Sequence, residues 1–508
     1  MHTMRAILIS LVVAGHTLSA DPVVDPPLTA PTPVPPPPVN SEVLSTLVDT
    51  DSNSGPTLSL AQAMKMALDN NYTRKISKEN VASARASVEQ ARGPVLPQVS
   101  VGLGYQQVNR DQYAVEAGFS PENQTTLQLN ASQMIYNDSQ VTNLRSTRRA
   151  LEAAQETDQS VQLEIIQQAG LAYVQVLSIA SNLRITEDNL RITRENLEIA
   201  KVRRSVGSVG PEEVLRFESA EARQESELWT ARNRLHSAVN QLNQILGESP
   251  DQSWKLEDLS LESAVFETSL KTIIPLANNS GASSRFRMAS ISYALSRAPE
   301  VAALGFSASA QRLRLDESRR SFFVPEVSAS FNYSHYLDSE YASSVASSTE
   351  DDDIWTFMVG ATLPIFEGGG RFGEIRQARA QLRTIEWQDA RLKQTISVNV
   401  SNALAAMASS WQSIRLSRIA SERADKNLEI VQEKYERGSV SIVDLLDAQN
   451  NALVQKLTAS IDLYRFFQDL LNYQRALSWP EPLADADSRD EFVQDFRSRF
   501  EGTGTSAP

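Results

Sequence analysis

The sequence contains no cysteine and only four histidines in 508 residues. The absence of cysteine excludes disulfides, thiolate metal ligands, a cysteine nucleophile and lipid attachment at an N-terminal cysteine. Two of the histidines, His2 and His16, lie near the N-terminus, and the other two, His236 and His335, lie in unrelated segments. The sequence therefore predicts no zinc site and no His-based catalytic cluster. We expect no cofactor, no metal and no enzymatic activity.

Long hydrophobic runs are also missing. Apart from residues 6–14, no apolar run approaches the roughly 20 residues that a membrane-spanning helix needs. Residues 6–14 follow Arg5 and precede a small-residue site at 18–20, a pattern typical of an export signal over residues 1–20. The net charge of −14 argues against nucleic acid as a partner, because binding a phosphate backbone requires clustered Lys and Arg.

Proline is concentrated near the N-terminus, where nine of the 22 prolines lie between Pro22 and Pro38. We interpret residues 21–56 as an extended linker without a core of its own. At the other end of the chain, we predict that residues 481–508 form a disordered C-terminal tail.

Four segments of roughly ten residues alternate apolar and polar side chains, which is the pattern of a β-strand with one apolar face. Their apolar sides begin at Val99, Leu127, Val327 and Trp355. About ten residues is the length at which a tilted strand crosses a bilayer. For any one pair of these segments, the alternative interpretation is a half-buried hairpin in the sheet of a soluble protein.

A long helix is predicted between the second strand and the first tight turn. Residues 138–204 contain no proline and one glycine, and a helix of this length would measure roughly 100 Å. An Asn-Leu-x-Ile pattern recurs every seven residues at Asn182, Asn189 and Asn196. Its Leu and Ile stripes are two residues, about 200°, apart, which suits a helix with a neighbour on each flank, as in the wall of a tube.

Two short turns end long helical patterns and begin new helices. At the first turn, Val206 and Gly207 precede Pro211, which stands where a first helical residue needs no N–H. At the second turn, Gly438 and Ser439 precede a helix that starts with Ser441 three residues before Asp444, the spacing of a capping box. The chain therefore contains two long helical hairpins.

The second half of the sequence repeats the first. Pro325 matches Pro97 at an offset of 228, and Asn427 matches Asn196 at an offset of 231. The boundaries that we predict are a first repeat at 57–247, a connector with little structure of its own at 248–287, and a second repeat at 288–480.

Four strands with an apolar face cannot close a barrel on their own, because single-chain barrels start at about eight strands. An open sheet edge in lipid leaves backbone groups unpaired at several kcal/mol each, so closure needs several copies. Aromatic residues lie near the ends of the four runs, where membrane-interface girdles are expected, although ordinary strand composition explains each one equally well: Tyr105, Tyr136, Tyr336, Trp355 and Phe366.

Taken together, these features resemble the TolC family of outer-membrane efflux proteins over roughly residues 57–480. The most specific likeness is Tyr-x-x-Gly-x-x-x-Ile-Val-Asp-Leu-Leu-Asp-Ala at 435–448, supported by Leu-Pro-Ile-Phe-Glu-Gly-Gly at 363–369. The resemblance implies a mainly α-helical fold with a transmembrane β part. It also implies a homotrimer that shares one twelve-stranded β-barrel in the outer membrane lipid, and helices that extend as a tunnel into the periplasm.

The resemblance further implies that the turns meet a periplasmic adaptor, which connects to an inner-membrane pump. The positions that match the narrow tip of the family are Glu213, Tyr435, Asp444 and Asp447, and acidic rings at such a mouth favour cations. The residues expected to face the adaptor are Val206, Gly207, Pro211, Gly438 and Ser439. A family member carries Arg two residues after the turn glycine, where this chain has Val440, and Arg437 is a candidate substitute.

The acidic residues have a simpler explanation as well. Asp444 fits a capping box, and Glu212 and Glu213 fit the favourable N-terminus of a helix at about 0.3–1 kcal/mol each. The function that we predict is a passive exit duct of a tripartite efflux or type I secretion system. A periplasmic coiled-coil spacer is the alternative, although it leaves the four duplicated strands unexplained.

Overall fold

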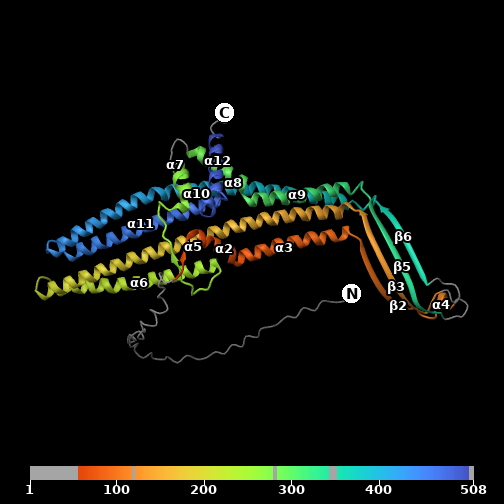
Figure 1. Cartoon of the computed structure of the whole chain (residues 1–508), viewed down its shortest axis with the longest axis horizontal. Helices are drawn as coiled ribbons and strands as arrows, with labels where there is room; N and C mark the ends of the chain where they lie inside the picture. Colours follow the sequence, from red (N-terminus) through yellow and green to blue (C-terminus); the bar gives the residue numbers. More distant parts are fainter. Residues whose placement is uncertain (1–54, 117–119, 278–282, 342–351, 503–508) are drawn as a thin grey trace, which may run out of the picture. The chain divides into compact units, whose positions relative to one another are not determined.

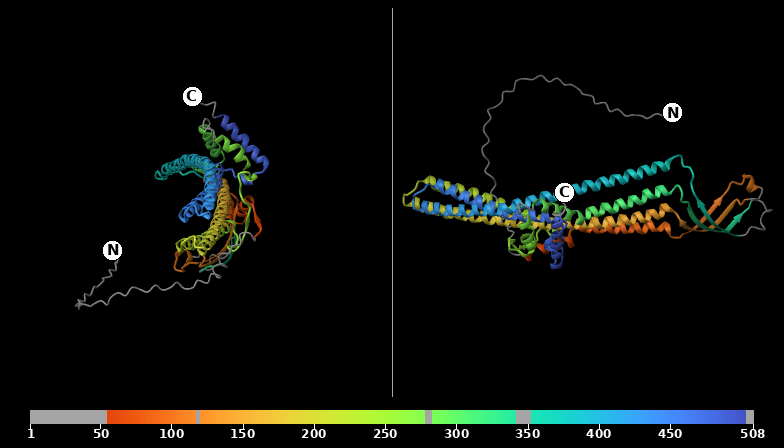
Figure 2. Two further views of the ribbon diagram at one scale, coloured as in Figure 1. Left: turned by 90° about the vertical axis from the view of Figure 1, so that its left-hand side faces the viewer. Right: turned by 90° about the horizontal axis from the view of Figure 1, so that it is seen from above.

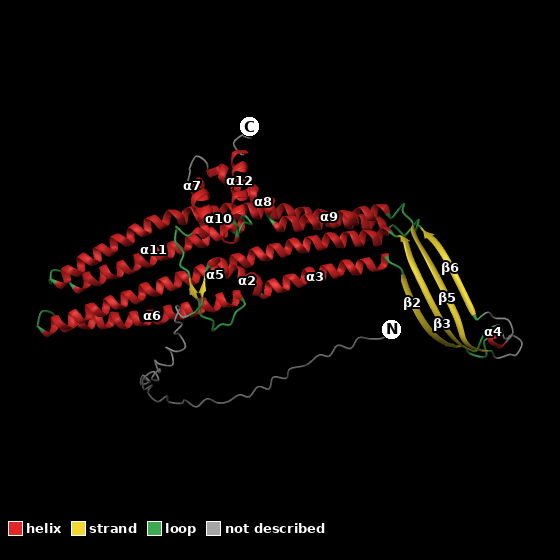
Figure 3. Cartoon of the chain, in the orientation of Figure 1, coloured by secondary structure: helices red, strands yellow, loops and turns green. Residues whose placement is uncertain are grey.

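The computed structural model describes residues 55–116, 120–277, 283–341 and 352–502, which all belong to one compact unit (Figure 1). The predicted export signal at 1–20 and nearly all of the predicted linker at 21–56 lie outside these residues. The described part is mostly helical, with one four-stranded sheet and a two-stranded parallel pair (Figure 3).

The first half of the chain supplies three helices of at most 21 residues, two long strands and one helical hairpin. Its elements are α2 (Leu60–Asn70), α3 (Tyr72–Arg92), β2 (Gln98–Gln107), α4 (Tyr113–Glu116), β3 (Asn123–Tyr136), α5 (Asp138–Ser205) and α6 (Pro211–Leu246). Ser59 and Gln62 form a capping box at the start of α2, and α6 ends where Gly247 adopts φ +73°. The long helix α5 ends within one residue of the sequence prediction.

The second half repeats this order with α8 (Ser283–Arg297), α9 (Pro299–Arg320), β5 (Glu326–Glu340), β6 (Asp353–Thr362), α10 (Gly370–Glu436) and α11 (Ile442–Ala476). Both predicted helical hairpins are therefore confirmed. The apolar alternation of the fourth run continues in the sequence through Leu363 to Ile365, but strand β6 ends at Thr362. The glycines that follow explain an early end, because Gly368 and Gly369 adopt positive φ and turn the chain into α10.

The four long strands form one antiparallel sheet in the order β2-β3-β5-β6. Strand β2 pairs with β3 through Val101 opposite Leu129, and β5 pairs with β6 through Phe331 opposite Phe357. The two halves of the chain meet where β3 pairs with β5. Within the described residues, β2 and β6 each keep one edge without a strand partner.

The long helices lie side by side in the same order as the strands that they join. On the sheet side, α5 packs between α3 and α9, and α9 packs against α10. On the side of the turns, α5 packs against α6 and α11, and α10 packs against α11 (Figures 1 and 2). The Leu stripe of α5 is buried at Leu190 and Leu197, while Ile192 and Ile199 of the Ile stripe are half-buried.

The main core lies where α2, the middle of α5, the middle of α10 and the end of α11 meet. Tyr173 of α5 is fully buried there, and its hydroxyl lies 2.8 Å from the carbonyl of Leu58 and 2.7 Å from that of Glu257. Leu58 ends strand β1 (Thr57–Leu58), and Glu257 directly follows strand β4 (Lys255–Leu256), which pairs with β1 in parallel. Helix α5 also contains an 18-residue window long and apolar enough to span a membrane, but 56% of it is buried, as in a core helix.

Two predictions about irregular segments are corrected by the structure. The connector predicted at 248–287 contains β4, short helical turns at 264–273, α7 (Ile274–Ala277) and the start of α8. The tail predicted to be disordered at 481–508 contains a 3₁₀ turn at Glu481–Leu483 and α12 (Ala486–Gly502). Phe492 of α12 stacks on Trp479 with ring centroids 3.7 Å apart, so buried aromatic area holds this segment in place.

Candidate functional site at the helical turns

The two helix-ending turns have the same backbone geometry. Gly207 and Gly438 adopt φ values of +76° and +77°, in the region that favours glycine. At the first turn, the N–H of Ser208 donates to the carbonyl of Arg203 at 2.9 Å. At the second turn, the N–H of Ser439 donates to the carbonyl of Lys434 at 2.8 Å. These bonds define Schellman ends 231 residues apart, so the duplication includes the turns.

The second turn begins its next helix with a complete capping box. The hydroxyl and backbone N–H of Ser441 donate to a carboxylate oxygen of Asp444 at 2.7 Å and 3.0 Å, and the N–H of Asp444 donates to the Ser441 hydroxyl at 3.3 Å. The donated hydrogen bonds from Ser441 lower the pKa of Asp444. The exposed Asp444 carboxylate therefore stays ionised while it stabilises the helix start.

The first turn lacks this box, and its acidic residue has a different partner. Gly210 stands at the position equivalent to Ser441 and has no side chain to offer Glu213, the equivalent of Asp444. Glu213 instead accepts a 2.8 Å hydrogen bond from the hydroxyl of Tyr435, which lies in the last turn of α10. This bond connects the start of α6 in the first hairpin to the end of α10 in the second.

Tyr435 is fully buried in a small core at the turns. The ring of Phe217 meets it edge-on with centroids 6.2 Å apart, and the guanidinium of Arg203 lies 4.7 Å from its ring centroid. Arg203 also donates a 3.2 Å hydrogen bond to the Tyr435 carbonyl. Burial, together with the hydrogen bond and negative charge of Glu213, raises the pKa of Tyr435 to about 12 against the opposing effect of Arg203. The phenol therefore remains a neutral donor at physiological pH.

The structure thus brings Tyr435 and Glu213 together and leaves Asp444 and Asp447 exposed. Arg437 forms an ion pair with Glu433 at 3.3 Å on its own helix and does not contact the acidic residues of the turns. Val440 packs against the buried cluster around Tyr435. The cation beside Tyr435 is Arg203, which sequence reasoning did not single out, although its place four residues before Gly207 was a usable signal.

A second feature missed from sequence is a buried polar contact between the hairpins. The amide of Gln449 donates to Asn189 Oδ1 at 3.0 Å and to the hydroxyl of Thr193 at 2.6 Å. All three side chains are buried. The contact joins α5 to α11 within the seven-residue repeat of α5. A buried polar residue in such a repeat fixes the register between the packed helices and lowers their stability.

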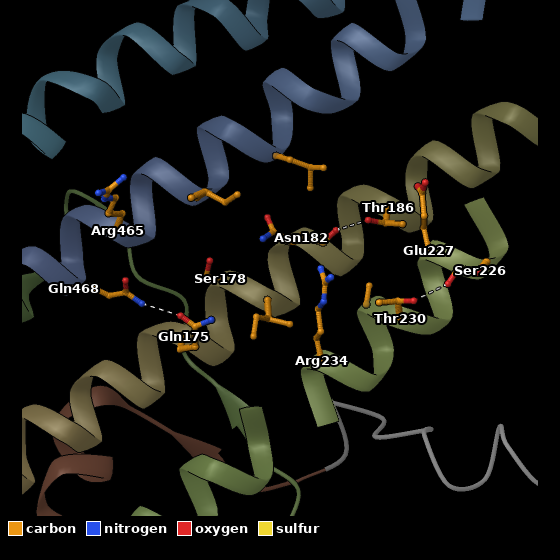
Figure 4. Close-up of a pocket in the computed structure, with 14 residues that line it drawn as sticks. Gln175, Ser178, Asn182, Thr186, Ser226, Glu227, Thr230, Arg234, Arg465 and Gln468 are labelled. Carbon is orange, nitrogen blue, oxygen red and sulfur yellow. Dashed lines mark hydrogen bonds between the residues drawn. The ribbon is translucent and has the colours of Figure 1, made fainter. Parts of the chain in front are cut away.

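Farther from the turns, a polar groove of about 700 Å³ lies between α5, α6 and α11 (Figure 4). Gln468 spans it by donating to Gln175 at 3.0 Å, and Arg234 and Arg465 stand at its sides. Its lining offers hydrogen bonds and charges. No group of three His, Asp or Glu side chains that could hold a metal occurs in the part of the chain that the structure describes.

Paired helical hairpins joined to a four-stranded antiparallel sheet, with an exposed apolar strand face, define a class of outer-membrane channel proteins that extend into the periplasm. The comparisons agree with this class. The chain belongs to the outer membrane efflux protein family, whose model matches residues 63–248 and 290–473.

The chain is 24% identical to outer membrane protein TolC of Escherichia coli over 428 residues, 82% of each chain. It is 23% identical to the toluene efflux pump outer membrane protein TtgF of Pseudomonas putida, across 81% of this chain and 80% of the relative. Among solved structures, the CmeC outer membrane channel of Campylobacter jejuni superimposes with a TM-score of 0.67 at 15% identity, covering 87% of this chain and 89% of that one. At 15% identity, the match to this structure shows a shared fold.

Proposed function

We propose that the protein is the passive exit duct of a tripartite efflux or type I secretion system. In this proposal, three copies share one twelve-stranded barrel in the outer membrane, and the helical turns dock on a periplasmic adaptor that connects to an inner-membrane pump. The observation that supports it best is the sheet, which has two unpaired edges among the described residues and large exposed apolar side chains. Lipid tolerates such a sheet only when its edges are closed.

The turn residues have separate proposed roles. Glu213 and Tyr435 hold the two hairpins of one chain together through their hydrogen bond. The exposed Asp444 and Asp447 are the candidates for a ring of charge at the mouth. The exposed turn residues are the candidates for the adaptor-facing surface: Val206, Gly207, Pro211, Gly438 and Ser439.

A cross-linking experiment tests the shared barrel. The cysteine-free chain accepts one cysteine on each edge strand, Ser100→Cys on β2 and Met358→Cys on β6, joined by a flexible bismaleimide in outer-membrane fractions. We expect dimers and trimers of the chain and no larger species. The matched control, Asn130→Cys with Asn332→Cys, places both cysteines on directly paired residues of the inner strands, so it cross-links within one chain.

The same sample distinguishes the alternative. Recovery of the protein from the soluble periplasm as a monomer, without cross-links between edge strands, would contradict the duct and favour the coiled-coil spacer.

A further inference from the structure

The helices carry an unusual density of positive charge where they leave the sheet. The stretches 85–92, 138–149, 312–320 and 371–383 contain thirteen arginines and five acidic residues, a net charge of +8 in a chain of net charge −14. Each stretch is the end of a helix nearest a strand. Eight of the thirteen arginines are exposed and form no ion pair within the described residues. The chain itself therefore leaves this charge available to a partner.

Four of these arginines share one face of the helical layer. A polar groove on the opposite face is lined by Asn143 and Ser146 of α5 and by Gln377 and Gln381 of α10. The four arginines each follow one of these residues by two positions, which places them about 200° around the helix from the groove: Arg145, Arg148, Arg379 and Arg383. We call these four side chains the basic face.

Aromatic residues lie between the basic face and the strands. Phe372 precedes Arg379 by seven residues, so it lies on the same face about two turns closer to the sheet, and it is 62% exposed. Phe323 and Phe366, at the junctions of α9 and α10 with the strands, are more than 80% exposed. On the strands, Val101 and Phe357 are also largely exposed. Apolar strand, exposed aromatic and exposed arginine thus follow one another along the chain.

This order matches the layers of a bilayer surface. Hydrocarbon accommodates apolar strand residues, the interface accommodates aromatic rings, and phosphate headgroups accommodate guanidinium groups whose stems lie along apolar surface. A water-filled lumen would instead leave Phe372 in contact with water. We propose that the basic face binds the anionic headgroups of phospholipids in the periplasm-facing leaflet of the outer membrane. The inference goes beyond the exit duct, because it requires only the membrane location of the sheet.

Native mass spectrometry of the purified full chain in an uncharged detergent tests the proposal. Phosphatidylglycerol and phosphatidylcholine with identical acyl chains are added in separate titrations at low and high salt. We expect the wild-type chain to retain more phosphatidylglycerol, and the preference to fall as salt rises. Each arginine near an anionic surface contributes about fivefold to binding, so Arg145→Gln, Arg148→Gln, Arg379→Gln and Arg383→Gln together should lower the preference more than about tenfold.

A matched variant removes four other exposed arginines, which form no ion pair with any residue that the structure describes, from the half of the helices nearer the turns: Arg216→Gln, Arg234→Gln, Arg415→Gln and Arg423→Gln. It should keep the preference, and replacing the basic face with lysines should restore most of it. Equal retention of both lipids by the wild type overturns the proposal, as does full preference in the glutamine variant. An altered ion selectivity in planar bilayers with unchanged lipid retention also overturns it, because the arginines would then face the lumen.

Discussion

At the scale of single residues, Tyr435 connects parts of the chain that are far apart in sequence. Its hydroxyl bonds Glu213 of α6, its carbonyl accepts from Arg203 of α5, and its ring meets Phe217. A hydrogen bond from a neutral donor to a carboxylate is strong when both groups are shielded from water. The Glu213–Tyr435 pair is therefore the side-chain contact at the turns whose removal should weaken them most.

Replacing Tyr435 with Phe tests this contact. The ring is kept, while Glu213, which is partly buried, loses its hydroxyl donor. We expect the turn region to lose about 1.5–3 kcal/mol of stability, the range for hydrogen bonds to charged groups. Amide hydrogen exchange in the first turns of α6 and α11 measures the loss. A double-mutant cycle with Glu213→Gln isolates the pair, and a coupling energy near zero would show that the hydroxyl contributes nothing there.

Local spacing predicted the capping role of Asp444, which the structure confirms, whereas Tyr435 was singled out by the family resemblance. Sequence reasoning did not identify Arg203 as the neighbouring cation, because that contact forms only when the ends of two helices 232 residues apart meet. It offered Arg437 as a substitute for the arginine that a family member has at the position of Val440. Arg437 instead pairs with Glu433, four residues earlier in the sequence. Local rules predict caps and turns, whereas contacts between hairpins require the fold.

At the scale of elements, the positive φ of the turn glycines fixes where each hairpin reverses. A Cβ at Gly207 meets no atom of the described residues within 4 Å, so the obstacle to a side chain there is the backbone conformation. Gly207→Ala should therefore destabilise the turn by about 1–2 kcal/mol, measured by hydrogen exchange around residues 203–211. Gly207→Asn should cost less, because Asn tolerates this region better than Ala.

The matched control is Gly305→Ala. Gly305 lies inside α9, and a Cβ there also meets nothing within 4 Å. Because Ala is the better helix former by about 1 kcal/mol, this variant should be as stable as the wild type or more stable. Equal destabilisation by both substitutions would show that crowding in an assembly, and not the backbone angle, decides the effect at Gly207.

Most elements were predictable because their ends carry glycine, proline or a cap, and because their apolar period changes from about 3.6 to 2. The helix α12 was missed because its high polarity suggested a tail. Its Phe492, Phe496 and Phe500 recur every four residues, which is a helical spacing. Burial of the first two side chains explains why a polar segment is ordered. The strand edges were predicted to need other copies, and within the part of the chain that the structure describes β2 and β6 remain the edges of the sheet.

At the scale of the whole molecule, charge is divided along the helices. Exposed arginines gather where the helices meet the sheet, while the second turn presents the exposed carboxylates of Asp444 and Asp447. In a symmetric assembly, each exposed carboxylate becomes a ring, and rings of carboxylates attract cations in pores. The exposure of Asp447, without a cap partner among the described residues, makes it the stronger candidate for the pore.

Charge removal that preserves the cap tests this assignment. In Asp444→Asn with Asp447→Asn, the amide oxygen at 444 can still accept from the N–H of Ser441 while both negative charges are lost. We expect higher single-channel conductance in planar bilayers and block by divalent cations about tenfold weaker, equivalent to ~1.4 kcal/mol. Ser441→Ala is the control, since it breaks the capping box and keeps both carboxylates. If Ser441→Ala reproduces the change, helix fraying opens the mouth; if neither variant changes conduction, the carboxylates do not line the pore.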